Sequence, residues 1–120
     1  MRVVCQKIVN PATLEIEERN PWISVGREYV VLEILAVPGS YIHLRIDLDS
    51  SVSSVWDAAM FETIDQSVPS NWVVEIASDG QLSIGPARWI EAGFWERYFE
   101  GDELAIGIFE REVAQIRAES

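Results

Sequence analysis

The sequence predicts an α+β domain. In it, a small, strongly bent antiparallel sheet of about six strands, of the SH3-like barrel type, precedes C-terminal helices. Three observations lead to this prediction. Residues 27–48 read as a β-hairpin, Asp79-Gly80 marks a second hairpin turn, and aromatic residues from position 94 recur at helical spacing. Strand signals fill residues 1–85 and helix signals fill residues 86–120, so we expect one domain over residues 1–120.

The composition is that of a folded, water-soluble protein. Its 120 residues are 48% hydrophobic, which excludes a disordered acidic tail. No apolar run reaches the roughly 18–20 residues that span a bilayer, and the N-terminus lacks the apolar segment of a signal peptide. The single cysteine, Cys5, allows no internal disulfide. We therefore expect a cytoplasmic protein that does not enter membranes.

The first strands are predicted from β-forming residues between turn signals. Residues 2–9 form the first strand, which ends at the turn Asn10-Pro11, and the alternation within 13–17 fits a short edge strand. Residues 26–37 give the strongest strand signal. After Arg27 and Glu28 they are apolar on both faces apart from Glu33, which predicts a central strand.

Residues 41–48 alternate between apolar and polar side chains and form the second strand of the hairpin. One face, expected to be buried, carries Ile42, Leu44, Ile46 and Leu48, and the exposed face carries Tyr41, His43, Arg45 and Asp47. Register is well specified here, because a slip by one residue would bury Arg45 and Asp47.

The second half of the sheet is predicted to contain three more strands. A loop at 49–54 leads to a strand at 59–64. Residues 72–77 and 81–84 then flank Ser78-Asp79-Gly80 as a hairpin. Trp72, Val74 and Ile76 share one face of this hairpin.

Helices follow Pro86, which suits the first turn of a helix that runs to Phe99 and breaks at Ala92-Gly93. Asp102 is a good N-cap for a terminal helix. The apolar stripe of that helix consists of Ala105, Phe109, Val113 and Ile116. Residues 104–109 also alternate as a strand would, but we favour the helix.

The net charge of −11 arises in one continuous part of the chain. Residues 1–46 and 111–120 are each neutral, whereas residues 47–110 carry thirteen acids and two arginines. Such a domain would repel nucleic-acid phosphates, so we expect no nucleic-acid partner. The acids serve either solubility or contact with a basic protein partner. The candidate contact residues are Asp47, Asp49, Asp57, Glu62, Asp65, Glu75 and Asp79, with Trp95 and Tyr98 as aromatic anchors.

The sequence contains no recognisable catalytic or cofactor site. His43 is not tied to a nucleophile or an orienting acid by any motif, and Cys5 is typical of a core residue. The segment 47–51 is similar to the start of a calcium loop, but Val52 replaces the required Gly and Ala58 the bidentate Glu. The glycines lack phosphate-loop spacing. We expect no enzyme activity, no metal and no cofactor.

Three segments resemble a group of small bacterial proteins. They are Gly26-Arg27-Glu28-Tyr29-Val30-Val31-Leu32-Glu33-Ile34, Pro69-Ser70-Asn71-Trp72 and Gly93-Phe94-Trp95-Glu96-Arg97-Tyr98-Phe99-Glu100-Gly101-Asp102. The group comprises immunity proteins of polymorphic toxin systems and uncharacterised relatives. The resemblance implies a cytoplasmic antidote that binds a toxin domain and blocks its active site. If that toxin is a nuclease, its basic substrate groove would attract an acidic partner.

A second interpretation is a small interaction or scaffold domain that forms a homodimer through the aromatic stripe Trp89–Phe99. We expect this stripe to be mainly core, with Phe94 and Phe99 directed inward and an edge of Trp95 or Tyr98 exposed. A dimer that persists in high salt would favour this interpretation, whereas a monomer would leave the acidic face free for a partner.

Overall fold

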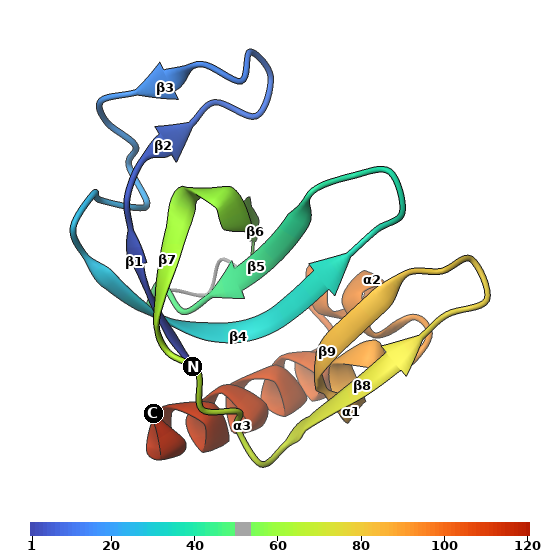
Figure 1. Cartoon of the computed structure of the whole chain (residues 1–120). Coiled ribbons are helices and arrows are strands. Elements are labelled where there is room, and N and C mark those ends of the chain that lie inside the picture. The colour runs from blue at the N-terminus through green and yellow to red at the C-terminus, as the bar shows by residue number, and fades with distance from the viewer. Residues whose placement is uncertain (50–53) are drawn as a thin grey trace.

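The computed structural model describes residues 1–49 and 54–120 and has the expected α+β class, with a sheet followed by helices (Figure 1). The strands are β1 (Arg2–Cys5), β2 (Ile8–Val9), β3 (Ile16–Glu17), β4 (Glu28–Ala36), β5 (Ile42–Ile46), β6 (Val55–Asp57), β7 (Phe61–Asp65), β8 (Trp72–Ile76) and β9 (Leu82–Pro86). A 3₁₀ turn, η1 (Ala58–Met60), joins β6 to β7. The helices are α1 (Ala87–Ile90), α2 (Phe94–Phe99) and α3 (Glu103–Glu119).

Seven strands form one antiparallel sheet around β4, which is the central strand as predicted. The order β6-β5-β4-β1-β7 is extended by β9, which pairs with β4, and by β8, which pairs with β9. β5 follows one edge of β4, and β1 and β9 follow the other. Among the described residues no ladder joins β6 to β7, so the bent sheet is not closed into a barrel.

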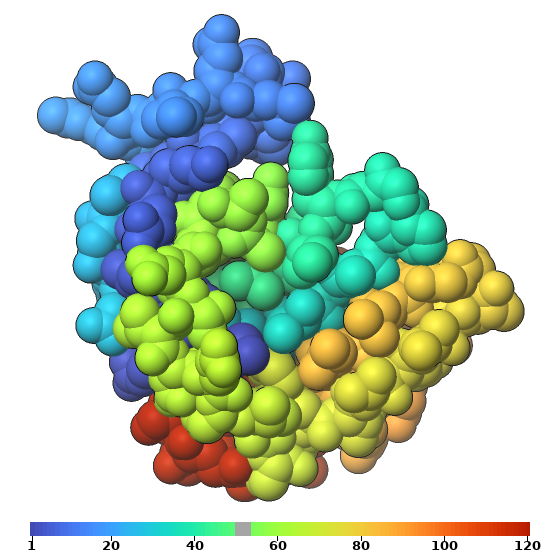
Figure 2. Space-filling model, in the orientation of Figure 1, coloured from blue at the N-terminus to red at the C-terminus, as the bar shows by residue number. Residues whose placement is uncertain are grey.

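The expected first strand is two strands. The backbone N–H groups of Gln6 and Lys7 both donate to the carbonyl of Met60, which ends β1 beside β7. β2 then leaves the sheet and pairs with β3 in a separate small hairpin. This hairpin projects from the body of the molecule (Figure 2).

The predicted strand at 59–64 begins later than expected. Asp57 accepts a hydrogen bond from the backbone N–H of Ala59 at 2.9 Å and so caps η1, and the strand starts only at Phe61. The short strand β6 was not predicted. Most of the expected loop at 49–54, including Val52 of the calcium-loop comparison, lies outside the described residues.

A register shift in the β4–β5 ladder changes which side chains are buried. Val31 lies opposite Ile46, but Glu33 lies opposite Arg45, so one residue of β4 is extra. The shift puts Val31 and Ile46 on one face of the sheet, called here the inner face. Glu33 and Arg45 lie on the other, called here the helix face.

The prediction that Arg45 and Asp47 are exposed is wrong. The helix face is covered: Trp95 of α2 lies over Arg45, and α3 packs against β4. Arg45 is buried, and the side chain of Asp47 is 9% exposed. Ile42, expected to be buried, is exposed because it lies at the far end of β5.

The helical part follows the prediction closely. Gly93 has a φ of 80°, a left-handed conformation that favours glycine, and it separates α1 from α2. α3 includes residues 104–109, so the helix favoured for them is confirmed. Its predicted stripe is buried, and it packs with the buried Trp89 and Phe94. Asp102 occupies the N-cap position, but its side chain makes no capping hydrogen bond.

The sheet core includes the single cysteine. Cys5 is 1% exposed and lies where β1 pairs with β7, beside Val3, Tyr29 and Met60 of the same core.

In the described ranges 1–49 and 54–120, no helix combines the length and the hydropathy that crossing a bilayer requires.

Candidate functional site

Two charged side chains lie buried on the helix face of the sheet. Arg45 of β5 donates from Nε to Oε1 of Glu33 on β4 at 3.0 Å, and their side chains are 8% and 1% exposed. The two residues are direct neighbours across the ladder, so the pairing follows from the register. Buried charges are tolerated when they are paired and hydrogen-bonded, as here.

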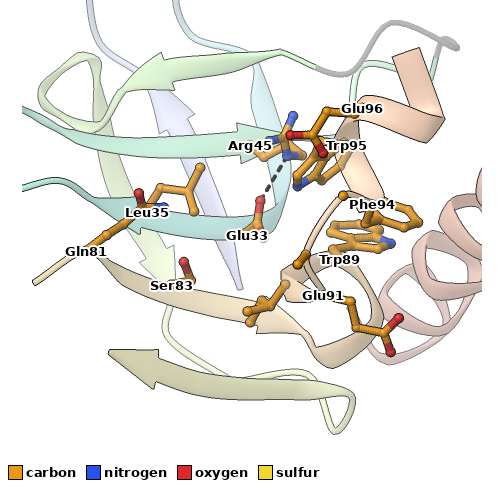
Figure 3. Close-up of a pocket in the computed structure, with 13 residues that line it drawn as sticks. Glu33, Leu35, Arg45, Gln81, Ser83, Trp89, Glu91, Phe94, Trp95 and Glu96 are labelled. Atoms are coloured by element: carbon orange, nitrogen blue, oxygen red, sulfur yellow. Dashed lines mark hydrogen bonds and ion pairs between the residues drawn. The ribbon is translucent and has the colours of Figure 1, made fainter. Parts of the chain in front are cut away.

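Trp95 of α2 covers this ion pair. The guanidinium carbon of Arg45 lies 3.8 Å from the centroid of the Trp95 ring, a close cation–π contact. Trp95 also contacts the rings of Trp89 and Phe94. Trp95 of the helical part therefore packs on the guanidinium of Arg45, and Glu33 of the sheet accepts its hydrogen bond (Figure 3).

Gly85 of β9 makes room for the Glu33 side chain. A Cβ at position 85 would lie 2.8 Å from Cγ of Glu33, closer than real Cβ contacts allow. Gly85 has no positive φ, so its role here is space and not backbone conformation. The absence of a side chain on β9 is what lets the carboxylate lie between the sheet and the helices.

Burial dominates the electrostatics of the pair. Desolvation raises the pKa of Glu33, although the charge and the hydrogen bond of Arg45 oppose the rise. Desolvation likewise lowers the pKa of Arg45, against the charge of Glu33. Burial thus opposes both charges, and each offsets part of this penalty on the other.

A pocket of about 450 Å³ opens beside the ion pair, between the helix face and the α1–α2 segment (Figure 3). We call it the carboxylate pocket. Its lining includes Glu33 and Arg45 from the sheet, the rings of Trp89, Phe94 and Trp95, and the exposed acids Glu91 and Glu96, with Leu35, Gln81, Ser83, Ile90, Ala92 and Gly93 completing the wall. Glu91 also pairs with Arg88 at 3.3 Å. Three carboxylates and one bound guanidinium next to aromatic rings suit a cationic group.

The pocket does not assemble a serine triad, although Ser83, His43 and Asp57 belong to one cross-strand row. Ser83 lies opposite Leu35, which lies opposite His43, which lies opposite Asp57. Ser83 and His43 are therefore two strands apart, about 10 Å at the usual strand spacing. This separation is far beyond hydrogen-bond reach.

Of the seven predicted contact acids, the structure brings together Asp47 and Asp49. Arg117 of α3 donates to Asp47 from Nη2 at 2.8 Å and pairs with Asp49 at 3.5 Å. Asp49 also pairs with Arg27 at 3.9 Å. These two carboxylates thus already have basic partners within the chain.

The other five predicted acids lie in three places: Asp57 in β6, Glu62 and Asp65 in β7, and Glu75 and Asp79 in the β8–β9 hairpin. Asp57 caps η1, Glu62 accepts from Gln6, Asp65 accepts from Ser67, Glu75 is exposed on β8, and Asp79 accepts from the backbone of Gln81 at the hairpin tip. No three His, Cys, Asp or Glu residues in the described parts of the chain converge as a metal site would require. The excess charge is therefore spread and not gathered into one tight cluster.

The predicted aromatic anchors are only partly available. Tyr98 is buried and Trp95 is partly buried over Arg45. Phe94 points inward as predicted, but the inward prediction for Phe99 is wrong, because this residue is 65% exposed. On a helix of 3.6 residues per turn, positions 94 and 98 share a face and position 99 points away from it.

Sequence reasoning missed the ion pair at the base of the pocket. One signal was present: Glu33 is the only charge in the apolar run from Tyr29 to Val37 of the strand predicted to be central, and a charge there requires a buried partner. Its partner could not be identified, because an unshifted alternation places Arg45 on the solvent face.

Comparisons of the chain with protein-family models, with curated proteins and with solved structures found no match.

Proposed function

We propose that the protein is a non-enzymatic, acidic binding protein of the immunity type. It binds a basic bacterial toxin domain, such as a nuclease, in the cytoplasm and blocks its active site. Its partner is a protein, and it needs no nucleic acid, membrane, metal or cofactor.

The carboxylate pocket carries this proposal. The three carboxylates of its lining outnumber the single guanidinium, which is bound by Glu33 and Trp95, and Arg88 outside the lining pairs with Glu91. A lysine or arginine side chain of the partner fits this lining, since Glu91 and Glu96 supply charge at the exposed side and the tryptophans supply an aromatic wall. The net charge of −11 adds long-range attraction toward a basic surface.

The resemblance to immunity proteins involves the same residues. Glu33 lies in the first resembling segment, and Gly93, Trp95 and Glu96 lie in the third. Five of the thirteen residues that line the pocket, these four and Phe94, thus lie in the stretches on which the resemblance rests.

We also infer that the sheet is a variant of the SH3-like barrel. The order β6-β5-β4-β1-β7, with a 3₁₀ turn leading into the strand that pairs with β1, supports this inference. The missing ladder between β6 and β7 is the departure from it.

Toxin neutralisation tests the proposed function. The C-terminal domain encoded by a toxin-like reading frame immediately upstream would be expressed alone and with this protein, and cell survival would be counted. We expect survival only with co-expression, and a 1:1 complex by calorimetry whose affinity falls as salt rises. Cell death in both cultures would contradict the proposal.

A matched pair of variants tests the pocket itself. Glu91→Gln with Glu96→Gln should weaken toxin binding by at least about tenfold, since both charges facing the partner are lost. Glu15→Gln with Glu18→Gln removes the same charge from the β2–β3 region and should change the affinity far less. Equal losses would show that total charge, and not the pocket, determines binding.

The second candidate function is the homodimeric interaction or scaffold domain. The exposed side chains of Phe99 and Leu104, five positions apart at the α2–α3 junction, favour it. Sizing the protein in low and high salt decides between the two: a dimer that persists in high salt and dissociates in Phe99→Ser supports this candidate. A monomer under both conditions contradicts it.

A further inference from the structure

β8 is the outermost strand of the sheet, and its second edge is unpaired in the described part of the chain. Figure 1 shows β9 on one side of β8 and no strand on the other, in agreement with the pairing. The β8–β9 ladder runs without a register shift from Trp72↔Pro86 to Ile76↔Leu82. β8 is therefore a regular edge strand whose outward-facing N–H and C=O groups make no ladder hydrogen bonds with another described strand.

The direction of those backbone groups follows from one hydrogen bond. Ala77 donates to the carbonyl of Gln81 at 2.9 Å next to the hairpin tip. In an antiparallel ladder bonded and non-bonded pairs alternate, so Glu75 and Val73 bond to β9. The N–H and C=O groups of Val74 and Ile76 then face outward. Pro86, which has no N–H, lies opposite Trp72 in a non-bonded position, as this alternation requires.

β8 has few of the features that usually protect an edge strand. It carries no lysine, proline or bulge, and Glu75 is its single charge. Val74 is 66% exposed and Ile76 is 73% exposed, and Val73 is exposed as well. An exposed, apolar, regular edge is a template for another strand.

The apolar surface continues from β8 across the inner face of the sheet. One row joins Ile76, Leu82, Ala36 and Ile42 through successive ladder pairs, and the next joins Val74, Ile84, Ile34 and Leu44. Neither row contains a charge. An added strand would therefore meet an aliphatic surface on its inner side.

The opposite side of β8 has a different chemistry. Glu75 lies on the helix face, in the same row as Ser83 and Leu35 of the carboxylate pocket. It is the only charge on β8, and no base lies in either apolar row. An incoming strand is thus favoured when it is basic toward the helix face and aliphatic toward the inner face.

Charge argues against a second copy of this chain as the occupant. Each copy carries a net charge of −11, and self-pairing of β8 would bring two such charges together without a base on either edge. A basic partner meets no such repulsion. The occupant favoured by the charge is therefore foreign.

We propose that β8 pairs with an extended segment of a protein partner in which aliphatic and basic residues alternate, so that the segment becomes an additional strand of the sheet. The inference rests on the proposed function in that both require a basic protein partner. It assigns the edge of β8, and not the pocket, as the surface that takes the partner's backbone.

A synthetic peptide tests this pairing without any toxin. The probe is acetyl-Val-Lys-Val-Lys-Val-Lys-Val-amide, and amide hydrogen exchange of the intact protein is followed by NMR. At saturating peptide, exchange at Val74 and Ile76 should slow roughly tenfold, because their N–H groups become hydrogen-bonded. Exchange at Val73 and Glu75, which already bond to β9, should change little. Unchanged exchange at Val74 and Ile76 overturns the proposal.

Variants of β8 distinguish backbone pairing from nonspecific association with the peptide. Val74→Pro removes an outward N–H without breaking the β8–β9 ladder and should abolish the protection at Ile76, whereas Val74→Thr should keep it. Glu75→Lys should reverse the preference toward the peptide with Glu in place of Lys. Equal binding by Val74→Pro and Val74→Thr overturns the proposal. So does protection of the edge without peptide that grows with protein concentration, since it identifies a second copy as the occupant.

The peptide experiment and the toxin experiment can fail separately, so a failure of the pairing is distinguished from a failure of the proposed function. Failure of the peptide to pair leaves toxin neutralisation by the wild-type protein unaffected. A wild-type protein that pairs with the peptide but does not rescue cells shows instead that the edge is real and the toxin assignment is wrong.

Discussion

Glu33 and Arg45 are the residues on which the helix side of the fold depends most. Each is buried, and each has the other as its nearest opposite charge, at 3.0 Å. Removing Arg45 takes away the guanidinium that compensates the Glu33 carboxylate, in a site with little access to water. Removing both leaves no charge to desolvate.

We therefore expect Arg45→Met to lower the free energy of unfolding by about 3–5 kcal/mol. Glu33→Met combined with Arg45→Met should recover most of this loss. Urea denaturation of the two variants and the wild type measures the effect. A single variant as stable as the wild type would show that the pair contributes nothing.

The pH dependence of Arg45→Met gives a second check. Without Arg45, burial alone acts on Glu33 and raises its pKa above the unfolded value of about 4.3. Between these two pKa values the folded state binds more protons than the unfolded state. The free energy of unfolding therefore falls as pH rises from the unfolded pKa through the raised folded pKa. The variant should accordingly be more stable at pH 5 than at pH 8.

Asp47 behaves in the opposite way. Partial burial would raise its pKa, but hydrogen bonds from Arg117 and from the backbone of Asp49, with the charge of Arg117, outweigh burial and lower it. The folded state therefore binds fewer protons, and the stabilisation is present above about pH 4 and lost as pH falls below it. Arg117 is half exposed, so solvent screening reduces the gain.

Asp47→Asn should cost about 1 kcal/mol of stability at pH 7, and the difference from the wild type should be smaller at pH 3, because the stabilisation is lost as pH falls toward the lowered pKa of Asp47. Urea denaturation at the two pH values measures it. Glu18→Gln, which removes an exposed carboxylate without an ion pair among the described residues, is the control. A deficit that persists unchanged at pH 3 would contradict the assignment to the Arg117 contact.

Among the elements, β9 and α3 each contain a glycine, and the two glycines have opposite roles. Gly85 of β9 is packed against Glu33, whereas a Cβ at Gly107 of α3 would meet nothing within 4 Å. A glycine inside a helix is unfavourable relative to alanine, so only the first of the two has a packing reason.

Gly85→Ala should destabilise the protein by about 1–3 kcal/mol, because the new methyl group displaces the Glu33 side chain. Gly107→Ala should stabilise it by about 0.5–1 kcal/mol. The two denaturation midpoints, measured side by side, test both expectations. The same sign for both substitutions would mean that the space around Gly85 is not limiting.

The elements predicted correctly are those specified by local pattern. The hairpin turn at Asp79-Gly80, the central strand β4 and the stripe of α3 all follow from residues close in sequence. β6 was missed and the β2–β3 hairpin was misplaced. Strands of two or three residues are too short to show an alternation of apolar and polar side chains, and they form only because other strands pair with them. The shift between Val31 and Glu33 is likewise a property of the pair of strands.

The same distinction applies to the candidate site. Trp95 could be chosen from the sequence because aromatic spacing is local, and Glu33 could be flagged as a charge in an apolar strand. The pocket itself depends on Arg45 changing faces and on Gly85 facing Glu33 from another strand. Neither is visible in the spacing of residues along the chain.

For the whole molecule, negative charge is the dominant long-range feature. The acids outnumber the bases by 20 to 9, and five of the nine bases, Arg2, Arg27, Arg45, Arg88 and Arg117, are engaged in ion pairs. The remaining repulsion opposes the compact state. The exposed pairs, those other than Arg45 with Glu33, contribute little in return.

Salt should therefore stabilise the protein. Raising NaCl from about 10 mM to about 150 mM shortens the Debye length from about 30 Å to about 8 Å and should raise the melting temperature by a few degrees. Thermal unfolding followed by circular dichroism measures this change, with KCl as the control for a specific ion effect. A melting temperature that falls with salt would mean that the surface ion pairs outweigh the repulsion.

The buried thiol of Cys5 can report how often the pairing between β1 and β7 opens. Burial raises its pKa, and at 1% exposure a reagent such as DTNB reaches it only when β1 lifts away from its neighbours. The chain has no other cysteine, so at a DTNB concentration at which the reaction is faster than reclosing, the rate of colour development equals the rate of these openings. The unmodified protein thus reports how often its first strand detaches, with no engineered label.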